Sequence, residues 1–462
     1  MNDKEQLPDV NRREFLKNTS LAAMMALMGG TEMRAEDAAK ADANSPEALT
    51  KIPPPPPVSY GVIGLNDWGR EILRTLSLLP AASVAAICDT YAHEFRKAKE
   101  IAPQAKTYED YKQLLADPAV QAVIVATPTG THRDIVLAAL AAGKHVYCEA
   151  PLANSIEDTR AIAKAAREAV KVVFQPGLQE RSHPQRHFLV PFIRSGAMGR
   201  NVMARAQWHK SESWARQSPN AEREKELNWR LYQASSAGLM GEEGIHQIDI
   251  ASWFWKSRPL AVTGFSSMIL WQGDHDRDVP DTAQAVFEYP GGVRLMYDAT
   301  LCSSFDAAYE LYYGTDSTIM LRDEKAWLFK EVNAPLLGWE VYCRRDQFYT
   351  STGIALVANG SKQTALTATA VSASPYEYAP LYYALEAFHN NTGLVAGVVK
   401  DFIDLYGDSD PKGLADAVKA VKLPKPAATW QEGFEATVLA LKANEAAVKK
   451  EKIVFQNEWF EL

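Results

Sequence analysis

The chain has 462 residues, of which 47% are hydrophobic and 23% are charged, and its formal net charge is −8. This length and apolar content suffice for two hydrophobic cores, at the usual one domain per roughly 100–200 residues. The acidic balance argues against a nucleic-acid or anionic-membrane partner, and no segment is long and apolar enough to span a bilayer.

Residues 1–57 are predicted to be an export signal followed by a linker. Arg12 and Arg13 precede a short apolar run over residues 19–30, a pattern that resembles a twin-arginine export signal. A frayed amphipathic helix is the alternative interpretation. Residues 53–57 are five consecutive prolines, which form a stiff extended spacer. We therefore expect an exported, periplasmic protein whose folded part begins after residue 57.

A strand, a tight glycine turn and a helix follow the linker. Residues 59–64 are a short apolar strand, and the turn from Gly64 to Gly69 leads into an amphipathic helix. Gly64 permits a sharp turn, Gly69 permits close packing, and the helix N-terminus offers free N–H groups to a pyrophosphate. Asn66 stands where a middle glycine is usual, and asparagine tolerates a left-handed backbone. The residues expected to contact a dinucleotide here are Gly64, Leu65, Asn66, Trp68 and Gly69.

Two further strands complete this pattern. Residues 83–88 form a strand that ends in Asp89, about twenty residues past the last glycine, where a carboxylate is expected to bind a ribose 2′-hydroxyl. Asp89 therefore favours NAD over NADP, although an ordinary turn residue is the alternative. Residues 122–127 form a third strand, and its loop adds Thr127, Pro128 and His132 to the predicted cofactor site.

The next segment ends at the same edge of the predicted sheet. Residues 134–142 are an alanine-rich helix that Gly143 ends, and residues 145–148 form a short strand that stops before Pro151. Glu149 follows this strand, where open α/β sheets bind their ligands. We therefore include Glu149 among the cofactor-binding residues.

A second group of chemically active residues lies between positions 238 and 255. If a helix begins at Glu242, its spacing places Glu242, His246, Asp249 and Trp253 on one face. One imidazole is then flanked by two carboxylates, which orient a histidine and raise its basicity for proton transfer. A solvated patch on a surface helix is the alternative. We expect no metal, because the chain has no dense ligand motif.

The remainder of the chain alternates strands with turns before a long helix. The predicted strands cover residues 261–270, 282–289, 293–301, 308–314 and 318–321, and the helix covers residues 431–449 before a last strand at 453–455. Tyr289-Pro-Gly-Gly292 is a hairpin signal. The less regular residues 331–374 are interpreted as an insertion. The four cysteines show no close-spaced disulfide pattern, and Cys88 and Cys148 are expected to be buried thiols.

Together these motifs resemble the Gfo/Idh/MocA family of oxidoreductases over nearly all of the chain after Val58. The motifs that carry the resemblance are Gly64-x-x-x-x-Gly69, Cys88-Asp89, Ala126-Thr-Pro128 with His132, and Ala142-Gly-Lys-His-Val-Tyr-Cys-Glu-x-Pro151. The resemblance implies an α/β protein with an NAD-binding Rossmann domain over residues 58–180. It also implies an α+β domain over residues 181–462, built on a large open, mainly antiparallel sheet. NAD(P)-linked chemistry on a sugar, polyol or cyclitol and a homo-oligomer are further expectations.

The resemblance indicates site residues, and the sequence departs from the family pattern at one position. Family members carry a lysine where this chain has Ala150, and alanine can neither hold a proton nor bind an alkoxide. The stretch from Glu242 to Asp249 resembles the family's Asp-x-Gly-x-His-x-x-Asp motif, with glutamate for the first aspartate. By this resemblance His246 is the acid/base and Asp249 its neighbour in the substrate site. The substrate-binding candidates are Arg181, His183 and Trp229, the last in the segment Asn228-Trp229-Arg230. An ion pair for Arg181 and a turn for His183 are equally good explanations of these two residues.

Three hypotheses for function follow. The leading one is an exported NAD-dependent oxidoreductase that transfers hydride to or from a sugar, polyol or cyclitol. The second is a glycoside-cleaving enzyme, a hydrolase or lyase, that uses tightly bound NAD in a redox-neutral cycle, and it is motivated by Ala150 and the export signal. The third is a nucleotide- or sugar-binding protein that lost catalysis together with the lysine.

Overall fold

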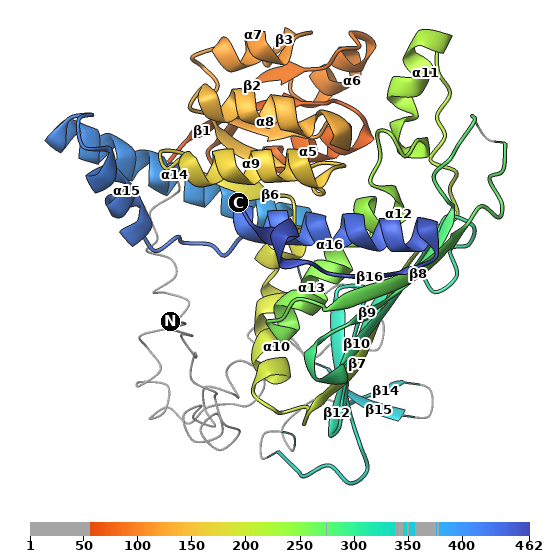
Figure 1. The fold of residues 1–462 in the computed structure, drawn as a ribbon. Helices are drawn as coiled ribbons and strands as arrows, with labels where there is room; N and C mark the ends of the chain where they lie inside the picture. Colours follow the sequence, from red (N-terminus) through yellow and green to blue (C-terminus); the bar gives the residue numbers. More distant parts are fainter. Residues whose placement is uncertain are drawn as a thin grey trace.

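The computed structural model describes residues 56–273, 275–337, 340, 345–348, 351–355, 376 and 378–462. The predicted export signal, most of the proline run, Cys343 and most of the predicted insertion lie outside these residues. Figure 1 shows two β-sheets, with long helices lying between them. None of the described helices has the length and apolar character needed to cross a membrane.

The first sheet is parallel and has the strand order β3-β2-β1-β4-β5-β6. Its strands are β1 (Val58–Ile63), β2 (Ala82–Cys88), β3 (Lys106–Tyr108), β4 (Ala122–Val125), β5 (His145–Cys148) and β6 (Phe174–Pro176). The helices that alternate with them are α5 (Asp67–Ser77), α6 (His93–Ile101), α7 (Tyr111–Ala116), α8 (His132–Ala141) and α9 (Ile156–Glu168). Every residue of β4 and β5 is buried, as expected where helices cover both faces of a parallel sheet. The predicted Rossmann fold is confirmed, and its strand order reverses between β1 and β4, where such sheets bind ligands.

A helix from the C-terminal part of the chain also packs on this first sheet. In α14 (Pro380–Tyr406), Leu381, Leu385 and Phe388 join the apolar core of the Rossmann domain. The Tyr60 hydroxyl on β1 lies 2.9 Å from Nδ1 of His389 on the same helix. The domain boundary at residue 180 stays a prediction, and α14 shows that residues far beyond it complete the first core.

The second sheet has ten described strands in the order β14-β15-β13-β12-β11-β7-β10-β9-β8-β16. They are β7 (Asn201–His209), β8 (Ala261–Ser267), β9 (Thr282–Glu288), β10 (Arg294–Thr300), β11 (Ala308–Gly314), β12 (Ser317–Arg322), β13 (Lys325–Lys330), β14 (Arg345–Phe348), β15 (Ser351–Ala355) and β16 (Lys452–Val454). Only the pairing of β7 with β10 is parallel among these strands, which confirms the predicted mainly antiparallel sheet. The predicted hairpin joins β9 to β10 through the 3₁₀ turn η5 (Pro290–Gly292).

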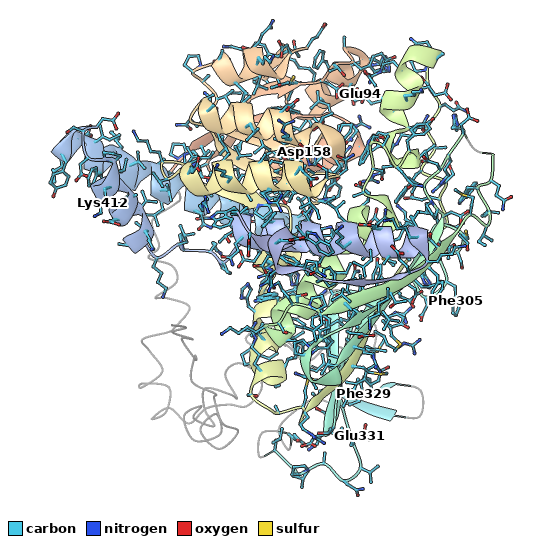
Figure 2. All side chains as sticks on the ribbon, in the orientation of Figure 1. Glu94, Asp158, Phe305, Phe329, Glu331 and Lys412 are labelled. Carbon is cyan, nitrogen blue, oxygen red and sulfur yellow. The ribbon has the colours of Figure 1, made fainter. Side chains whose placement is uncertain are left out.

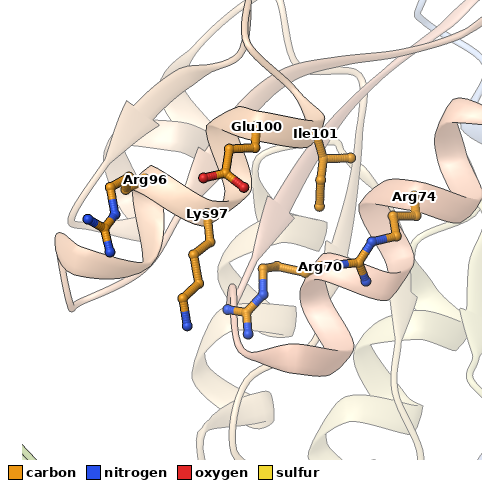
Figure 3. Close-up of a pocket in the computed structure, with 6 residues that line it drawn as sticks. All are labelled: Arg70, Arg74, Arg96, Lys97, Glu100 and Ile101. Carbon is orange, nitrogen blue, oxygen red and sulfur yellow. The ribbon is translucent and has the colours of Figure 1, made fainter.

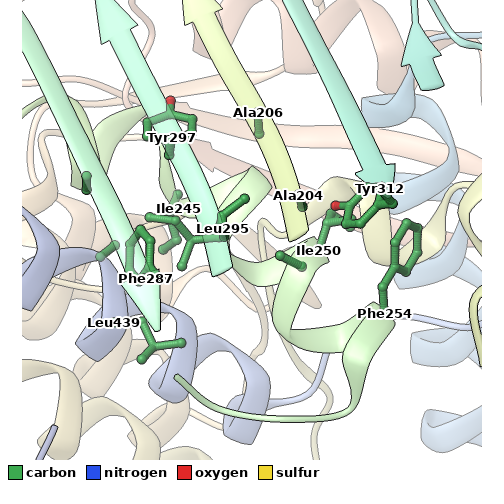
Figure 4. Packing of buried hydrophobic residues seen from close by; sticks show 14 of the residues in the cluster. Ala204, Ala206, Ile245, Ile250, Phe254, Phe287, Leu295, Tyr297, Tyr312 and Leu439 are labelled. Carbon is green, nitrogen blue, oxygen red and sulfur yellow. The ribbon is translucent and has the colours of Figure 1, made fainter. Parts of the chain in front are cut away.

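Helices cover one face of the second sheet and form its core with it. These helices are α10 (Pro184–Arg194), α13 (Ile245–Trp255) and α16 (Trp430–Lys449). Another helix, the short α15 (Pro411–Ala420), follows α14 in the chain. Figure 4 shows Phe287, Leu295 and Phe254 packed between strands and helices in this core. A Cβ on Gly264 of β8 would lie 2.9 Å from the backbone of Ala447, so glycine lets α16 lie close against the sheet.

Candidate functional site

The turn between β1 and α5 requires both of its glycines. Gly64 has φ +93, and a Cβ there would lie 2.6 Å from the backbone oxygen of Ala126. A Cβ on Gly69 would lie 1.9 Å from the oxygen of Gly64. Asn66 has φ −59, so it does not use the left-handed conformation expected for it. Its Oδ1 instead accepts a hydrogen bond from the Gly69 N–H (3.0 Å), which makes Asn66 the N-cap of α5.

This turn fits a dinucleotide because its donors are unused and its backbone is open. The N–H groups of Asn66, Asp67 and Trp68 have no acceptor among the described residues. They lie at the first turn of α5, where the helix dipole favours an anion. A side chain on either glycine would collide with the backbone of Ala126 or of Gly64, so the tight turn that leaves these donors unused requires both glycines and suits NAD.

Asp89 closes the same turn from the end of β2. The N–H groups of Leu65 and Tyr91 donate to its Oδ2 and Oδ1, each at 2.8 Å. Burial raises the pKa of Asp89, and these two donors with the charge of Arg223 oppose that rise. Each carboxylate oxygen can accept a second hydrogen bond. Asp89 therefore fixes Leu65 in the turn and keeps acceptors for a ribose hydroxyl.

His132 does not offer its ring to a cofactor, in contrast to the prediction. The side chain is 1% exposed, with Nδ1 at 3.1 Å from the oxygen of Pro151 and Nε2 at 2.9 Å from the oxygen of Thr127. Both ring nitrogens are thus occupied by backbone carbonyls. His132 ties the loop after β4, with Thr127 and Pro128, to the loop after β5.

Glu149 ends β5 beside Ala150 and is a carboxyl with one buried, unpartnered oxygen among the described residues. Its Oε1 is buried and accepts no hydrogen bond from the described residues. Burial raises the pKa of Glu149 to about 7, opposed by the indole of Trp68 and the charge of Arg230. The adjacent Ala150 packs against the apolar core of the second sheet. The strand end therefore holds a group that titrates near neutral pH and no lysine.

Glu242 is not on the same helical face as His246, because the predicted single helix is two helices. Helix α12 (Gly238–Glu242) ends before Glu243 and Gly244, and α13 begins at Ile245. The Glu242 carboxylate accepts hydrogen bonds from the N–H of Ala237 (2.8 Å) and the Thr129 hydroxyl (3.1 Å). Thr129 lies in η2 (Thr129–Thr131), directly after β4. Glu242 therefore joins the two domains, which replaces its predicted catalytic role.

Asp249 is paired with Arg181 and not with His246. The Arg181 Nε and Nη2 groups donate to the two Asp249 oxygens at 2.8 and 2.7 Å. The same guanidinium lies 5.1 Å from the ring centre of Trp253 and 3.6 Å from the Glu432 carboxylate. These contacts occupy both residues within the protein, so Arg181 is structural here and Asp249 acts on His246 only through its charge.

His183 is buried and structural as well, which corrects its predicted contact with substrate. Its exposed fraction is 1%, and its Nδ1 accepts a hydrogen bond from the Gln185 N–H (3.3 Å) as the N-cap of α10. The ring lies edge-on to Tyr376 and Tyr383, at 4.7 and 5.1 Å between ring centres. Burial lowers the pKa of His183 to about 4. The ring therefore stays neutral and packed.

His246 keeps a free imidazole, and Glu180, a carboxylate near it besides the predicted Asp249, was not predicted. The ring is half-buried and forms no hydrogen bond with the described residues. Burial lowers the pKa of His246, while the charges of Glu180 and Asp249 oppose this change. Glu180 lies in η3 (Gln179–Ser182) and accepts a hydrogen bond from Nε of Arg186 (2.7 Å). Burial would raise the pKa of Glu180, but Arg186 and the two nearby histidines hold it below its ordinary value.

Arg230 belongs to the segment Asn228-Trp229-Arg230, in which the sequence predicted a substrate contact at Trp229. It lies in η4 (Trp229–Leu231), and its guanidinium carbon is 5.3 Å from the ring centres of both Trp214 and Trp229. The Glu243 carboxylate is 3.9 Å away, too far for a hydrogen bond, and the Arg230 guanidinium donates to no described residue. Its charge lowers the pKa of Glu149, Glu242 and Glu243. Arg230 is thus a cation with unused donors among buried carboxyls.

A hollow between α5 and α6 lies apart from these groups. Figure 3 shows its lining residues, Arg70, Arg74, Arg96, Lys97, Glu100 and Ile101. None of the predicted site residues borders it, and Arg70 is already bound by Asp67 and Glu94. Among the described residues, no three histidine, cysteine or acidic side chains are grouped to hold a metal ion.

Two consecutive segments of the chain match family models. Residues 58–177 match the model described as an oxidoreductase family with an NAD-binding Rossmann fold. Residues 191–320 match the GFO/IDH/MocA C-terminal domain, so the two models together cover more than half of the chain. The chain belongs to the Gfo/Idh/MocA family. The predicted family and its NAD-binding Rossmann domain are therefore confirmed.

Similar proteins agree with this Gfo/Idh/MocA assignment. An inositol 2-dehydrogenase of Rubrobacter xylanophilus is 31% identical over 202 residues, which are 43% of this chain and 52% of the relative. The chain spans about half the length of the first curated relatives it matches. A levoglucosan dehydrogenase in complex with NADH shares the fold with a TM-score of 0.63 at 17% identity, covering 86% of this chain and 99% of the other. An oxidoreductase domain protein from Kribbella flavida also has a TM-score of 0.63, at 18% identity and covering 87% and 100%.

Proposed function

We propose that this Gfo/Idh/MocA protein is an NAD-dependent oxidoreductase that acts on a sugar, polyol or cyclitol by hydride transfer. The observation that carries the proposal is the free imidazole of His246. His246 lies in the first turn of α13, four residues after Glu242, which is bonded to the Thr129 loop at the carboxyl edge of the NAD-binding sheet. The names of the inositol and levoglucosan dehydrogenases support the substrate class.

We assign to His246 the removal of the proton from the substrate hydroxyl. Burial keeps the ring neutral at neutral pH, so a ring nitrogen can accept a proton. The Glu180 carboxylate then stabilises the imidazolium that forms, and Arg186 holds that carboxylate ionised. NAD, when bound at the edge of the first sheet, supplies the hydride acceptor.

We assign to Arg230 the stabilisation of the negative charge that develops on the substrate oxygen. Ala150 cannot bind that oxygen, whereas the Arg230 guanidinium has unused donors and stands between two indole faces. The adjacent carboxyls of Glu149 and Glu243 disfavour an anionic substrate, so a neutral carbohydrate is the expected ligand. An arginine cannot take a proton from the substrate, which leaves proton transfer to His246.

The proposal is tested by steady-state reduction of NAD with myo-inositol, levoglucosan and a panel of aldoses. His246→Gln should lower kcat/KM by about 10²–10⁴ and remove the fall in rate on acidification below the ordinary histidine pKa. Arg230→Gln should lower it by about 10²–10³, and Arg230→Lys should lower it less. The matched control is Arg258→Gln, since Arg258 is exposed and lies over the ring of Phe460. Purified protein that neither contains nor binds NAD(H), or an unchanged rate in the His246 variant, would overturn the proposal.

A redox-neutral cycle on a glycoside is the second candidate, and Ala150 favours it. Such a cycle reduces and reoxidises one bound NAD, so it needs no cofactor exchange. Cleavage of a chromogenic aryl glycoside without added NAD would support it, and a strict requirement for stoichiometric NAD would exclude it. Bound NAD without turnover of any tested carbohydrate would instead indicate the binding protein.

The site of action is proposed to be outside the cytoplasm. The paired Arg12 and Arg13 before an apolar run support export by the twin-arginine route. Replacing both arginines with lysine should then keep the protein in the cytoplasm, and unchanged export would contradict this proposal.

A further inference from the structure

A long connection from the second sheet runs along the carboxyl edge of the first sheet. We call residues 211–237, between β7 and α12, the arm. Near its start, Arg216 forms an ion pair with Asp67 at the beginning of α5, directly after β1. Near its end, the backbone oxygen of Ala234 accepts a hydrogen bond from Nδ2 of Asn154 (2.9 Å), after β5. The arm therefore contacts this edge of the sheet at its centre, beside the dinucleotide turn, and again after β5.

The middle of the arm contacts the loop after β2. Arg223 lies in α11 (Ala221–Leu227) and donates to the Thr90 hydroxyl (3.1 Å). Its guanidinium carbon stands 4.4 Å from the ring centre of Tyr91. Figure 1 shows α11 beside this end of the first sheet, close to α6. Asp89, the predicted ribose ligand, immediately precedes these two contacts.

Hydrogen bonds join the first part of the arm, at Arg216, to its later part, at Asn228. Asn228 is fully buried, and its Oδ1 accepts a hydrogen bond from the Arg216 N–H (2.7 Å) while its Nδ2 donates to the Arg216 oxygen (3.1 Å). Nη1 of Arg277 donates to the oxygen of Ser213 (2.6 Å), which anchors the arm to the second domain. Trp214 holds a left-handed backbone, with φ +64, next to this anchor. The arm is thus a braced loop that contacts the NAD-binding domain mainly through exposed or half-buried side chains.

One nitrogen of the Arg223 guanidinium has binding capacity that the protein does not use. Nη1 forms an ion pair with Glu226, whereas Nε is buried without a hydrogen-bond partner among the described residues. The charge of Arg223 acts on the Asp89 carboxylate, so the guanidinium stands at the ribose end of the site. A donor in this position matches the hydroxyls and the adenine ring of a dinucleotide.

We propose that the arm is a strap over the adenosine half of NAD and that Arg223 is a cofactor-binding residue supplied by the second domain. The inference rests on the proposed function, because it requires NAD at the edge of the first sheet. NAD leaves only when the contacts of Arg216 and Arg223 with the first domain open. Release of NAD is then slow.

The test is the rate at which NADH leaves the full-length protein. Energy transfer from tryptophan to bound NADH is followed after excess NAD is added, for wild type and variants. Arg223→Gln should speed release about tenfold, since a charge-assisted contact is lost, and Arg216→Gln should speed it less because that pair is exposed. Arg258→Gln is the matched control and should leave the rate unchanged.

Binding of cofactor fragments distinguishes the loss of a contact with adenosine from a general weakening of cofactor binding. Arg223→Gln should weaken ADP-ribose binding about tenfold and leave nicotinamide mononucleotide binding unchanged. If wild type binds NADH but Arg223→Gln releases it at the wild-type rate, the strap is refuted while the proposed function stands. If wild type does not bind NADH at all, the proposed function fails first. Thermal unfolding of both arginine variants shows whether they fold.

Discussion

Replacing Glu149 with glutamine should stabilise the protein at alkaline pH and change it little at acidic pH. Burial raises the pKa of this carboxyl from 4.5 to about 7 in the folded protein, whereas the unfolded chain keeps the ordinary value. Below pH 4.5 the group is neutral in both states and costs nothing. Between pH 4.5 and 7 the unfolded state loses its proton first, so stability falls as the pH rises through this window and levels off above it.

The size of the effect follows from the same values. Each tenfold change in proton affinity corresponds to about 1.4 kcal/mol, so ionising Glu149 costs about 3 kcal/mol above pH 7. Glutamine has nearly the same shape and cannot ionise. Glu149→Gln should therefore raise the free energy of unfolding by up to about 3 kcal/mol at pH 8.5 and by less than about 1 kcal/mol at pH 5.

Urea and thermal unfolding of the NAD-free protein at pH 5 and pH 8.5 measure this difference. Glu109→Gln is the matched control, because Glu109 is an exposed carboxyl of the same domain. An equal gain at both pH values would show that the benefit is packing and not ionisation. A loss at pH 8.5 would refute the reasoning, since it would mean that the ionised Glu149 is stabilised by its surroundings.

Further substitutions probe the turn and the buried ion pair of Arg186 with Glu310. Gly69→Ala places a Cβ 1.9 Å from the oxygen of Gly64 and should abolish NADH binding in a fluorescence titration. The control is Gly397→Ala in α14, whose Cβ would meet no atom within 4 Å. This control should raise the free energy of unfolding by about 0.5–1 kcal/mol. Unchanged NADH affinity in the first variant would contradict the packing argument. Arg186→Met leaves the buried Glu310 without its cation and should cost about 3–5 kcal/mol in urea unfolding, with partial recovery in the double variant with Glu310→Met. A loss below about 1 kcal/mol would show that the pair is dispensable.

Local pattern was reliable where short-range contacts decide the structure. The long helix predicted over residues 431–449 is α16, and the short strand predicted over residues 145–148 is β5. The helix assumed to run from Glu242 through His246 failed, because Glu243 and Gly244 interrupt it. The break turns Glu242 toward Thr129, a partner 113 positions earlier in the chain. Helical spacing alone could not show this contact, since it depends on how the two domains pack.

The sequence by itself determined the nucleotide turn and the family. Gly64 and Gly69 act through a strand, a turn and a helix N-terminus that lie within a few residues of each other, and Asp89 follows at the end of the next strand, so their spacing carries the chemistry. Tertiary structure alone decided that Asp249 binds Arg181 and that His246 keeps a free ring near Glu180. Hydrogen bonds between residues this far apart in the chain form only after the sheets and helices have packed. The same reason explains why the arm, which lies across the edge of a sheet from another domain, was visible only in the folded molecule.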